Sequence, residues 1–556
     1  MNNYKSWWKE AVVYQTYPRS FKDSNADGIG DLKGITSKLD YLQNLGIDVI
    51  WLSPHFKSPN VDNGYDIADY QAIMEDFGTM EDFDEMLTGI HQKGMKLIID
   101  LVVNHSSDEH FWFQEARKSK DNPYRDYYIW KPEIPNDWIS FFSGSAWDLD
   151  EITNEYYLHL FVKKQPDLNW ENPVLRHEIY KMMKFWLDKG VNGFRMDVIS
   201  LISKDPNYPD FPEDRFGDLS FYANGPKVHG YLQEMNREVL SKYDCMTVGE
   251  AFGVSAEQAN LYVGKERREL NMIYHFDHAV PRDENCFINP KPEFTLIELK
   301  QIFSKWDVAT GNDGWNTVYF GNHDNPRMLS RFGDTEQYFQ ASAKMLATVL
   351  LTLRGTPYLY QGDEIGMSNA NFQDVSEYND VQVLNAYKTL VETQKYDKQT
   401  FLKACNKIAR DHARTPMQWN RGANAGFSEG EKMWLKVNEN YKKVNVEAQE
   451  NDENSILNYY RKMIQLRKNT PALIYGDYQD LRPNCNNIWL YSREYEEKKI
   501  LVMNNFTDEN QAFEADFLIN TKELVLANIE VKNEISNQRY ELKPYESRVY
   551  LVQTNN

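Results

Sequence analysis

The 556-residue sequence has little cysteine and no long apolar segment. Its cysteines, Cys245, Cys286, Cys405 and Cys485, are widely separated and lack metal-ligand spacing, which predicts free thiols in a reducing compartment. The N-terminus lacks the apolar stretch of a signal peptide. The apolar run Met345–Leu353 is far shorter than the roughly 20 residues of a membrane helix. These absences predict a soluble, cytoplasmic protein that does not bind membranes.

Basic residues are also few relative to acidic ones, 62 against 83, which gives a net charge of −21. Such a charge argues against nucleic acid or anionic membranes as partners. A glycine-rich phosphate-binding loop is missing, which disfavours phosphoryl transfer. The 11 histidines are not clustered as two-metal hydrolysis would require. We expect no organic cofactor, and we expect the chain to act as a monomer.

Short apolar runs recur eight times, and most are followed by a stretch with amphipathic helical spacing. This alternation predicts an α/β fold in which a parallel sheet is covered by helices. Eight such units would close into a (β/α)8 TIM barrel, whose active site lies at the carboxyl ends of the strands. The runs are residues 11–18, 48–54, 96–104, 193–200, 246–252, 272–276, 317–324 and 356–365.

Two stretches depart from this alternation. Residues 104–172 are rich in polar and aromatic side chains and too long for a βα connection, so we expect a small inserted domain after the third strand. Residues 475–556 alternate as antiparallel strands do, which predicts a C-terminal β-sandwich. The barrel would then comprise residues 1–103 and 173–474, with a helix from about Pro173 to Lys189 before its fourth strand.

Three of the apolar runs end in an acid: Asp197, Glu250 and Asp324. Because a buried carboxylate is costly unless it is paired or does chemistry, these acids predict one site at the barrel mouth. Arg195 lies on the same strand face as Asp197, and its guanidinium would favour the ionised carboxylate. A nucleophilic carboxylate beside a proton-donating one describes retaining glycoside hydrolysis, in which the two lie about 5–5.5 Å apart.

The motifs around these acids resemble those of glycoside hydrolase family 13, the α-amylase superfamily, over essentially the whole chain. The matching segments are Asp100–His105, Gly193–Asp197, Gly249–Glu250 and Asn322–Asp324. Within the family, the chain is most similar to the oligo-1,6-glucosidase and dextran glucosidase group. The stretches that carry this similarity are Leu158–Phe161, Lys164–Trp170 and Ala413–Trp419.

The resemblance implies that Asp197 is the nucleophile, Glu250 the acid/base and Asp324 the acid that binds hydroxyls of the distorted sugar. Tyr65 would stack on the glucose. The other substrate-binding residues that it implies are Asp66, His105, Phe161, Gln165, Arg195, Val198, His323 and Arg414. Arg414 would pair with Asp66 and close the pocket behind the non-reducing end. A closed pocket makes an exo-acting enzyme that releases one glucose at a time from a small oligosaccharide.

Val198, directly after the predicted nucleophile, bears on the linkage. Members that favour α-1,6 bonds resemble this chain in carrying valine there, whereas α-1,4-specific relatives carry alanine or threonine. A β-branched apolar wall beside the leaving group would exclude the α-1,4 geometry by sterics. The predicted substrates are isomaltose, panose and short isomaltooligosaccharides, with isomaltulose as a further one.

Other enzymes of the family remain alternatives. His323–Arg327 and Ser455–Leu466 also resemble sucrose isomerases, which form isomaltulose or trehalulose. Those enzymes carry threonine after the nucleophile and a basic loop where this chain has Phe276–Asp283. Trehalose-6-phosphate hydrolases share the valine. Catalytically inactive, transporter-associated barrels are a remote alternative, because they would have a membrane span and lack the acids.

An acidic loop after the first apolar run predicts a cation site. It places oxygen ligands at alternate positions and glycine at the sixth, as in the first half of an EF-hand loop. The twelfth position is Gly34 rather than glutamate, so the loop is not an EF-hand. We expect it to bind one structural Ca²⁺, with Mg²⁺ as the alternative. The ligands would be Asp23, Asn25, Asp27, the Ile29 carbonyl and Asp31.

Overall fold

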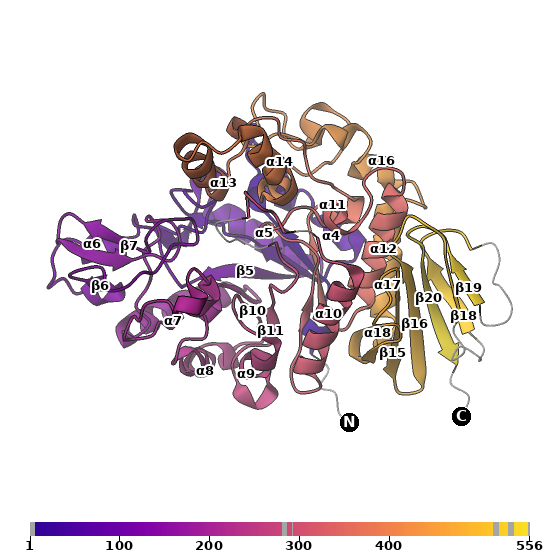
Figure 1. The fold of residues 1–556 in the computed structure, drawn as a ribbon, viewed down its shortest axis with the longest axis horizontal. Coiled ribbons are helices and arrows are strands. Elements are labelled where there is room, and N and C mark those ends of the chain that lie inside the picture. The colour runs from indigo at the N-terminus through magenta and orange to yellow at the C-terminus, as the bar shows by residue number, and fades with distance from the viewer. Residues whose placement is uncertain (1–5, 281–285, 292, 515–521, 532–538, 554–556) are drawn as a thin grey trace.

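A parallel β-barrel forms the centre of the computed structural model (Figure 1). The structure describes residues 6–280, 286–291, 293–514, 522–531 and 539–553. All eight predicted runs form strands of this barrel. In spatial order they are β11 (Met272–Tyr274), β10 (Met246–Glu250), β9 (Gly193–Asp197), β5 (Lys96–Val102), β2 (Val49–Leu52), β1 (Val13–Thr16), β13 (Thr356–Tyr360) and β12 (Thr317–Val318). A parallel bridge between Ile273 and Asn316 joins the two ends of this order, so the sheet closes.

The barrel strands are buried on both faces, which explains why they read as unbroken apolar runs. Side chains such as Val13, Trp51 and Val248 fill the barrel interior. Their neighbours along the strands, such as Val12 and Ile50, belong to the larger core that packs against the helices. The predicted TIM barrel is therefore confirmed, with a filled interior rather than a pore.

Helices surround the barrel, and their apolar residues recur at helical spacing. In α5 (Met80–Gln92), Phe83, Met86, Leu87 and Ile90 are buried, and Thr79 caps the first turn with Asp82. The helix predicted before the fourth strand is α7 (Pro173–Asp188). The other main covering helices are α8 (Val228–Glu238), α9 (Ala259–Val263), α10 (Leu296–Thr310), α12 (Phe339–Thr352) and α17 (Ile456–Lys468). Among the described residues, no helix is both long and apolar enough to cross a membrane.

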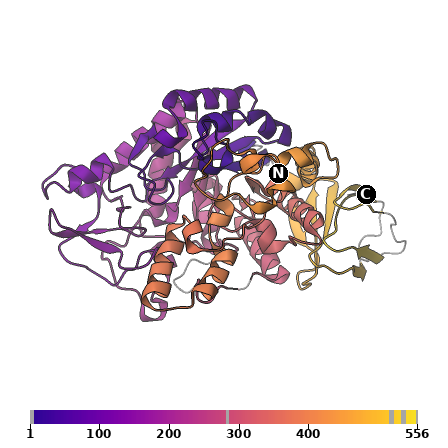
Figure 2. The same cartoon turned by 90° about the horizontal axis from the view of Figure 1, so that it is seen from above.

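A small antiparallel sheet lies between β5 and β9, inside the stretch predicted to be inserted. It has the order β6 (Trp130–Lys131), β8 (Glu155–Leu158), β7 (Trp147–Asp150), and the short helix α6 (Phe111–Ala116) precedes it. Figure 1 and Figure 2 both place this sheet at one end of the molecule and the C-terminal sheets at the other.

The C-terminal region consists of two antiparallel sheets that share one apolar cluster, as the predicted sandwich requires. The larger sheet has the order β14 (Asp477–Asp480), β15 (Ile488–Tyr495), β16 (Lys498–Asn505), β20 (Ser547–Gln553), β18 (Lys522–Ala527). The smaller sheet pairs β17 (Gln511–Glu514) with β19 (Arg539–Leu542). Leu490 and Leu501 of the larger sheet and Phe513 and Leu542 of the smaller one lie in the shared cluster.

A helical excursion between β13 and α17 was not distinguished from the barrel by the sequence pattern. It contains α13 (Val381–Ala386), a π-helical segment Tyr387–Thr393 and α14 (Lys398–Ile408), and it has its own apolar cluster. Asn385 Nδ2 donates a hydrogen bond of 3.4 Å to the carbonyl oxygen of Phe142 in the insertion. The excursion and the insertion therefore meet over the barrel mouth.

Candidate active site

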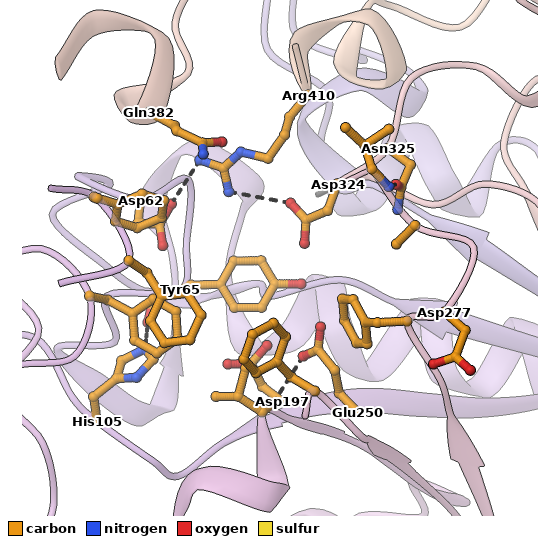
Figure 3. Close-up of a pocket in the computed structure, with 18 of the residues that line it drawn as sticks. Asp62, Tyr65, His105, Asp197, Glu250, Asp277, Asp324, Asn325, Gln382 and Arg410 are labelled. Carbon is orange, nitrogen blue, oxygen red and sulfur yellow. Dashed lines mark hydrogen bonds and ion pairs between the residues drawn. The ribbon is translucent and has the colours of Figure 1, made fainter. Parts of the chain in front are cut away.

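A cavity of about 260 Å³ lies at the carboxyl ends of the barrel strands, where the sequence predicted a site (Figure 3). The three predicted acids line it, and so do four of the predicted substrate-binding residues, namely Tyr65, His105, Phe161 and Val198. In Figure 3, Asp324 and Arg410 lie on one side of the cavity, Asp197 and Glu250 on the other, and the Tyr65 ring between them.

Arg195 holds the carboxylates at the ends of three strands. Its Nη1 donates to Asp100 Oδ1 at 2.7 Å and to Asp197 Oδ1 at 2.6 Å, and its Nη2 lies 2.6 Å from Glu250 Oε2. The guanidinium is fully buried beneath the cavity, and Trp51 Nε1 donates to the other oxygen of Asp100. Arg195 therefore orients the acids. It does not line the cavity, although the sequence predicted it to be a substrate-binding residue.

The two acids at the ends of β9 and β10 are electrostatically coupled. Burial and the negative charge of Glu250 raise the pKa of Asp197, and together they outweigh the opposing effect of Arg195. Arg195 favours the ionised Asp197, as the sequence predicted, but the net shift of the pKa is upward.

Asp324 follows β12 in an irregular turn. The strand ends at Val318, earlier than expected, because Asn322 Oδ1 accepts the Asp324 backbone N–H at 2.9 Å and turns the chain. Asp324 Oδ1 accepts hydrogen bonds from Arg414 Nη2 at 2.8 Å and from Arg410 Nη1 at 3.3 Å. Two guanidinium groups thus hold this carboxylate at the cavity wall.

His323 lies behind the cavity, where it supports Tyr65. The two rings stack with their centroids 5.3 Å apart, and the Tyr65 hydroxyl lies 2.7 Å from His323 Nε2. Gln15 Nε2 donates to His323 Nδ1 at 2.7 Å, which leaves Nε2 to carry the ring proton. Burial lowers the pKa of His323 to about 3, so the ring is neutral at pH 7. His323 fixes the tyrosine ring against the cavity.

The predicted Asp66–Arg414 pair is wrong. Asp66 Oδ1 accepts hydrogen bonds from Ser58 Oγ and the Asp62 backbone N–H, both at 3.0 Å, and Oδ2 accepts the Val61 N–H at 2.8 Å. These donors use the carboxylate to close a turn, away from the cavity. Arg414 instead pairs with Asp324 and donates from Nε to the backbone carbonyl of His323.

Arg410 and Asp62 occupy the place that the sequence assigned to that pair. Arg410 Nη2 lies 3.6 Å from Asp62 Oδ1, and both residues line the cavity. Arg410 also binds Asp380, with Nη2 2.5 Å from Oδ1. Burial raises the pKa of Asp62 to about 6, although the Arg410 guanidinium opposes this effect. One guanidinium therefore joins Asp62, Asp324 and Asp380 at one side of the cavity.

His105 and Gln165 support the Asp62 side of the cavity. Gln165 Nε2 donates to Asp62 Oδ2 at 3.2 Å and lies 3.2 Å from His105 Nε2. Gln165 is fully buried and outside the cavity lining, so it orients its neighbours. The His105 ring packs at 4.9 Å from the Phe161 ring, and burial lowers the pKa of His105 to about 4.

Much of the lining was not predicted from the sequence. The additional apolar residues are Phe141, Phe142, Phe252, Phe276, Ala279, Val280 and Phe294, and the polar ones are Asp62, Asp277, Lys291, Asn325, Gln382 and Arg410. Asp62 and Arg410 could have been found, since each stands four residues before a residue that was chosen. Pro281–Asp283, from the loop that distinguishes sucrose isomerases, lie outside the described residues.

The predicted cation loop folds as successive turns closed by its own side chains. Asp23 Oδ1 accepts the Asn25 and Ala26 N–H groups, and its Oδ2 accepts hydrogen bonds from the Gly28 N–H and Ser428 Oγ. Asn25 Oδ1 accepts the Asp27 N–H, and Asp27 Oδ1 accepts the Ile29 N–H.

Asp31 completes this loop, because its Oδ2 accepts the Ser24 N–H and its Oδ1 accepts the Gly34 N–H. Among the described residues, no group of three or more His, Cys, Asp or Glu side chains is arranged to hold a metal. The oxygen donors nevertheless suit a hard divalent cation in chemical type.

Known proteins that are similar to this chain include one family model, curated relatives and solved structures. The family described as "Alpha amylase, catalytic domain" matches residues 15–476. An oligo-1,6-glucosidase of Parageobacillus thermoglucosidasius is 53% identical over 558 residues, covering 98% of this chain and 99% of that protein. One of Bacillus cereus is 53% identical over 557 residues, with the same coverage. The structure of an isomaltulose synthase mutant from Erwinia rhapontici NX5 with sucrose superposes with a TM-score of 0.96 at 44% identity, covering 99% of this chain and 100% of that one.

Proposed function

Because the chain belongs to the alpha-amylase family, we propose that it is a retaining, exo-acting α-glucosidase that removes glucose from short α-1,6-linked oligosaccharides. The observation that carries this proposal is that the guanidinium of Arg195 contacts the carboxyl groups of both Asp197 and Glu250. Asp197 and Glu250 bind adjacent nitrogens of Arg195, each at 2.6 Å. That arrangement favours the roughly 5–5.5 Å separation of retaining enzymes over the 6.5–9.5 Å of inverting ones.

In the proposed mechanism, Asp197 attacks the anomeric carbon and Glu250 protonates the leaving oxygen. The resulting glycosyl–Asp197 ester is hydrolysed by a water molecule that Glu250 then deprotonates. This chemistry needs an ionised Asp197 and a protonated Glu250, and the hydrogen bond of 2.6 Å from Arg195 Nη1 to Asp197 Oδ1 supports the ionised nucleophile. Asp324, held by Arg410 and Arg414, would accept hydrogen bonds from sugar hydroxyls.

In the proposed arrangement, the side of the cavity that holds Arg410 is closed, which makes the enzyme exo-acting. Arg410 joins Asp62 and Asp324 there, and the Tyr65 ring offers an apolar face between them and the catalytic pair. A sugar chain could not continue past this end, so the non-reducing glucose would occupy it. The apolar wall formed by residues such as Phe252, Phe276 and Phe294 would face the departing sugar.

The linkage proposal rests on the relatives and on Val198. The two curated relatives bear the name oligo-1,6-glucosidase, and Val198 lines the cavity with an exposed fraction of 8%. Isomaltose, panose and isomaltooligosaccharides are the proposed substrates, with isomaltulose as a further one. The superposition with an isomaltulose synthase supports sucrose isomerisation as the second candidate.

A phosphorylated disaccharide fits the lining poorly. The described lining carries five carboxylates, of Asp62, Asp197, Glu250, Asp277 and Asp324. Its cationic groups are Lys291 and Arg410, and Arg410 is engaged by three acids. This negative field favours neutral sugars over trehalose-6-phosphate.

Panose tests linkage and direction in one reaction, because its α-1,6 bond is at the non-reducing end and its α-1,4 bond at the reducing end. We expect glucose and maltose as first products, with the new glucose appearing as the α-anomer in ¹H NMR. Isomaltose as the first disaccharide would refute the linkage, and an initial β-anomer would refute retention. Asp197→Asn should abolish turnover.

We also propose that the acidic loop binds one Ca²⁺ through Asp23, Asn25, Asp27, the Ile29 carbonyl and Asp31. The oxygen donor set and its negative charge support this proposal. Metal analysis of protein dialysed against Ca²⁺ should give one ion per chain, and chelation should lower the melting temperature. An Asp27→Ala variant that still retains the ion would contradict the site.

The proposed setting is the cytoplasm, with a monomer as the active unit. None of the four cysteines forms a disulfide in the described part of the chain, which suits a reducing compartment. Light scattering of the purified enzyme during turnover would test the monomer.

A further inference from the structure

Val198 is the only residue between the predicted nucleophile and the short 3₁₀ turn Ile199–Leu201, and its backbone is left-handed, with φ 35° and ψ 40°. A β-branched residue seldom adopts this conformation, which costs about 1–2 kcal/mol. Such strain persists only where the surroundings impose it, and it gathers at functional sites. The conformation therefore calls for a reason beyond the side chain that faces the leaving group.

The surroundings hold this turn against the end of β10. The Leu201 N–H donates to the Val198 carbonyl at 2.9 Å, and Ser200 Oγ donates to the Phe252 carbonyl at 2.7 Å. A Cβ on Gly249 would meet Ile199 Cγ2 at 2.9 Å, so the turn packs directly on the strand that carries Glu250.

The left-handed turn aims the Val198 N–H at Glu250 Oε2, to which it donates at 2.9 Å. The same oxygen lies 2.6 Å from Arg195 Nη2. A proton on Oε2 would face the Val198 N–H donor and a positively charged guanidinium nitrogen, so protonation is disfavoured there. The carboxyl must then carry its proton on the other oxygen, Oε1.

We propose that the strained main chain of Val198 is a positioning device, which selects Oε1 of Glu250 as the oxygen that protonates the leaving group. This inference rests on the proposed function, in which Glu250 is the acid. It gives residue 198 two separable tasks. The side chain faces the leaving sugar, and the N–H orients the acid.

An ester in place of the amide tests the second task without changing the side chain. α-Hydroxyisovaleric acid, introduced at position 198 by nonsense suppression, removes only the N–H. We expect cleavage of phenyl α-glucosides with poor leaving groups to fall about 10- to 100-fold, as loss of a hydrogen bond to a charged group predicts. α-Glucosyl fluoride, which needs no proton donor, should lose less than about 3-fold, since only acid catalysis is impaired.

Control variants separate this role from other causes. Val198→Ala and Val198→Thr keep the N–H. In these variants the cleavage rate should depend on leaving-group basicity as it does in the wild type, even if linkage preference changes. Glu250→Gln should show the steep dependence of an enzyme without its acid. An ester variant with the wild-type dependence, or with equal losses on all substrates, would overturn the proposal.

A second measurement does not depend on the folding of the ester variant. In protein labelled with ¹⁵N-valine, the Val198 amide proton should resonate downfield and move upfield in Glu250→Gln. An unchanged resonance would also overturn the proposal. If the wild type cleaves none of the glucosides, the proposed function fails instead, and the two failures are distinguishable.

Discussion

Arg410 joins three acidic side chains at one side of the cavity, and this geometry gives it a specific role in substrate binding. Its fork contacts Asp380 at 2.5 Å, Asp324 at 3.3 Å and Asp62 at 3.6 Å. Because a planar fork can reach several acceptors at once, lysine cannot replace it geometrically. The acids that would bind the terminal glucose therefore depend on Arg410 for their positions.

Arg410→Lys should lower kcat/KM for isomaltose about 10- to 100-fold, mainly through KM, because charged hydrogen bonds at the glucose site are lost. Steady-state kinetics on isomaltose measure this effect. Arg215→Lys is the matched control, since Arg215 forms an exposed pair with Asp218 and does not line the cavity. Equal kinetics for Arg410→Lys and the control would remove Arg410 from the site.

Asp62 should make stability depend on pH. Its pKa is raised from 3.8 to about 6 in the folded protein, so the native state holds a proton between about pH 4 and 6 that the unfolded chain has released. Ionised Asp62 therefore destabilises the fold above pH 6, and the cost disappears as the pH falls toward 4.

Asp62→Asn should thus stabilise the protein by about 3 kcal/mol at pH 7.5 and by about 1 kcal/mol at pH 4.5, following the pKa difference. Urea unfolding of both proteins at both pH values measures this change. A gain that is the same at both pH values would mean that ionisation of Asp62 is not its cause.

Among single residues, the sequence predicted the catalytic acids but did not predict Asp62 and Arg410, which we propose close the cavity. Asp197, Glu250 and Asp324 could be predicted because each ends an apolar run. Asp62 and Arg410 lie in loops, where apolar periodicity carries no information. The neighbouring Asp66 and Arg414 have the same residue types and spacing, and only the hydrogen bonds of the folded loops separate the two pairs.

Among the elements, β9 depends on glycine at its first residue. Gly193 has φ 146°, and a Cβ there would meet the Met246 carbonyl oxygen at 1.9 Å. Gly193 and Met246 are paired in the register of β9 with β10. The two strands that carry Asp197 and Glu250 can approach only because this side chain is absent.

Gly193→Ala should therefore destabilise the protein by about 3 kcal/mol and reduce activity, because backbone atoms must shift. Gly230→Ala is the control. Gly230 lies in α8, where a Cβ would meet nothing within 4 Å, so alanine should stabilise the helix by about 0.5–1 kcal/mol. Denaturant unfolding compares them, and similar values for both variants would contradict the steric argument.

The barrel elements were predictable, because all eight strands are buried on both faces and read as apolar runs. The end of β12 was predicted too late because Tyr319 and Phe320 continue the apolar run, while the turn at Asn322 depends on side-chain hydrogen bonds. The excursion with α13 and α14 was missed because its amphipathic helices resemble those of the barrel. Its separate apolar cluster exists only in three dimensions.

At the scale of the whole molecule, a buried cation links the insertion to the barrel. Lys204 Nζ lies 2.6 Å from both Asn104 Oδ1 and Asp167 Oδ1 and donates to the Leu201 carbonyl at 2.7 Å. These groups come from the end of β5, the insertion and the turn after β9. Lys204 therefore fixes the insertion, which supplies Phe141, Phe142 and Phe161 to the cavity.

Lys204→Met should destabilise the protein by about 3–5 kcal/mol, because Asp167 would remain buried without its cation. Limited proteolysis should cut the insertion first. The control is Lys181→Met, whose partner Glu178 is on the surface of α7. Unaltered cleavage in Lys204→Met would show that the insertion is held by other contacts.

The central claim is that the enzyme hydrolyses α-1,6-linked glucosides in a cavity that Asp62 and Arg410 close and that Val198 lines. The most direct test is kcat/KM of the purified enzyme on isomaltose, maltose and sucrose under the same conditions. We expect isomaltose to be cleaved fastest and sucrose to yield no isomaltulose or trehalulose. Faster cleavage of maltose, or isomaltulose formed from sucrose, would contradict the account.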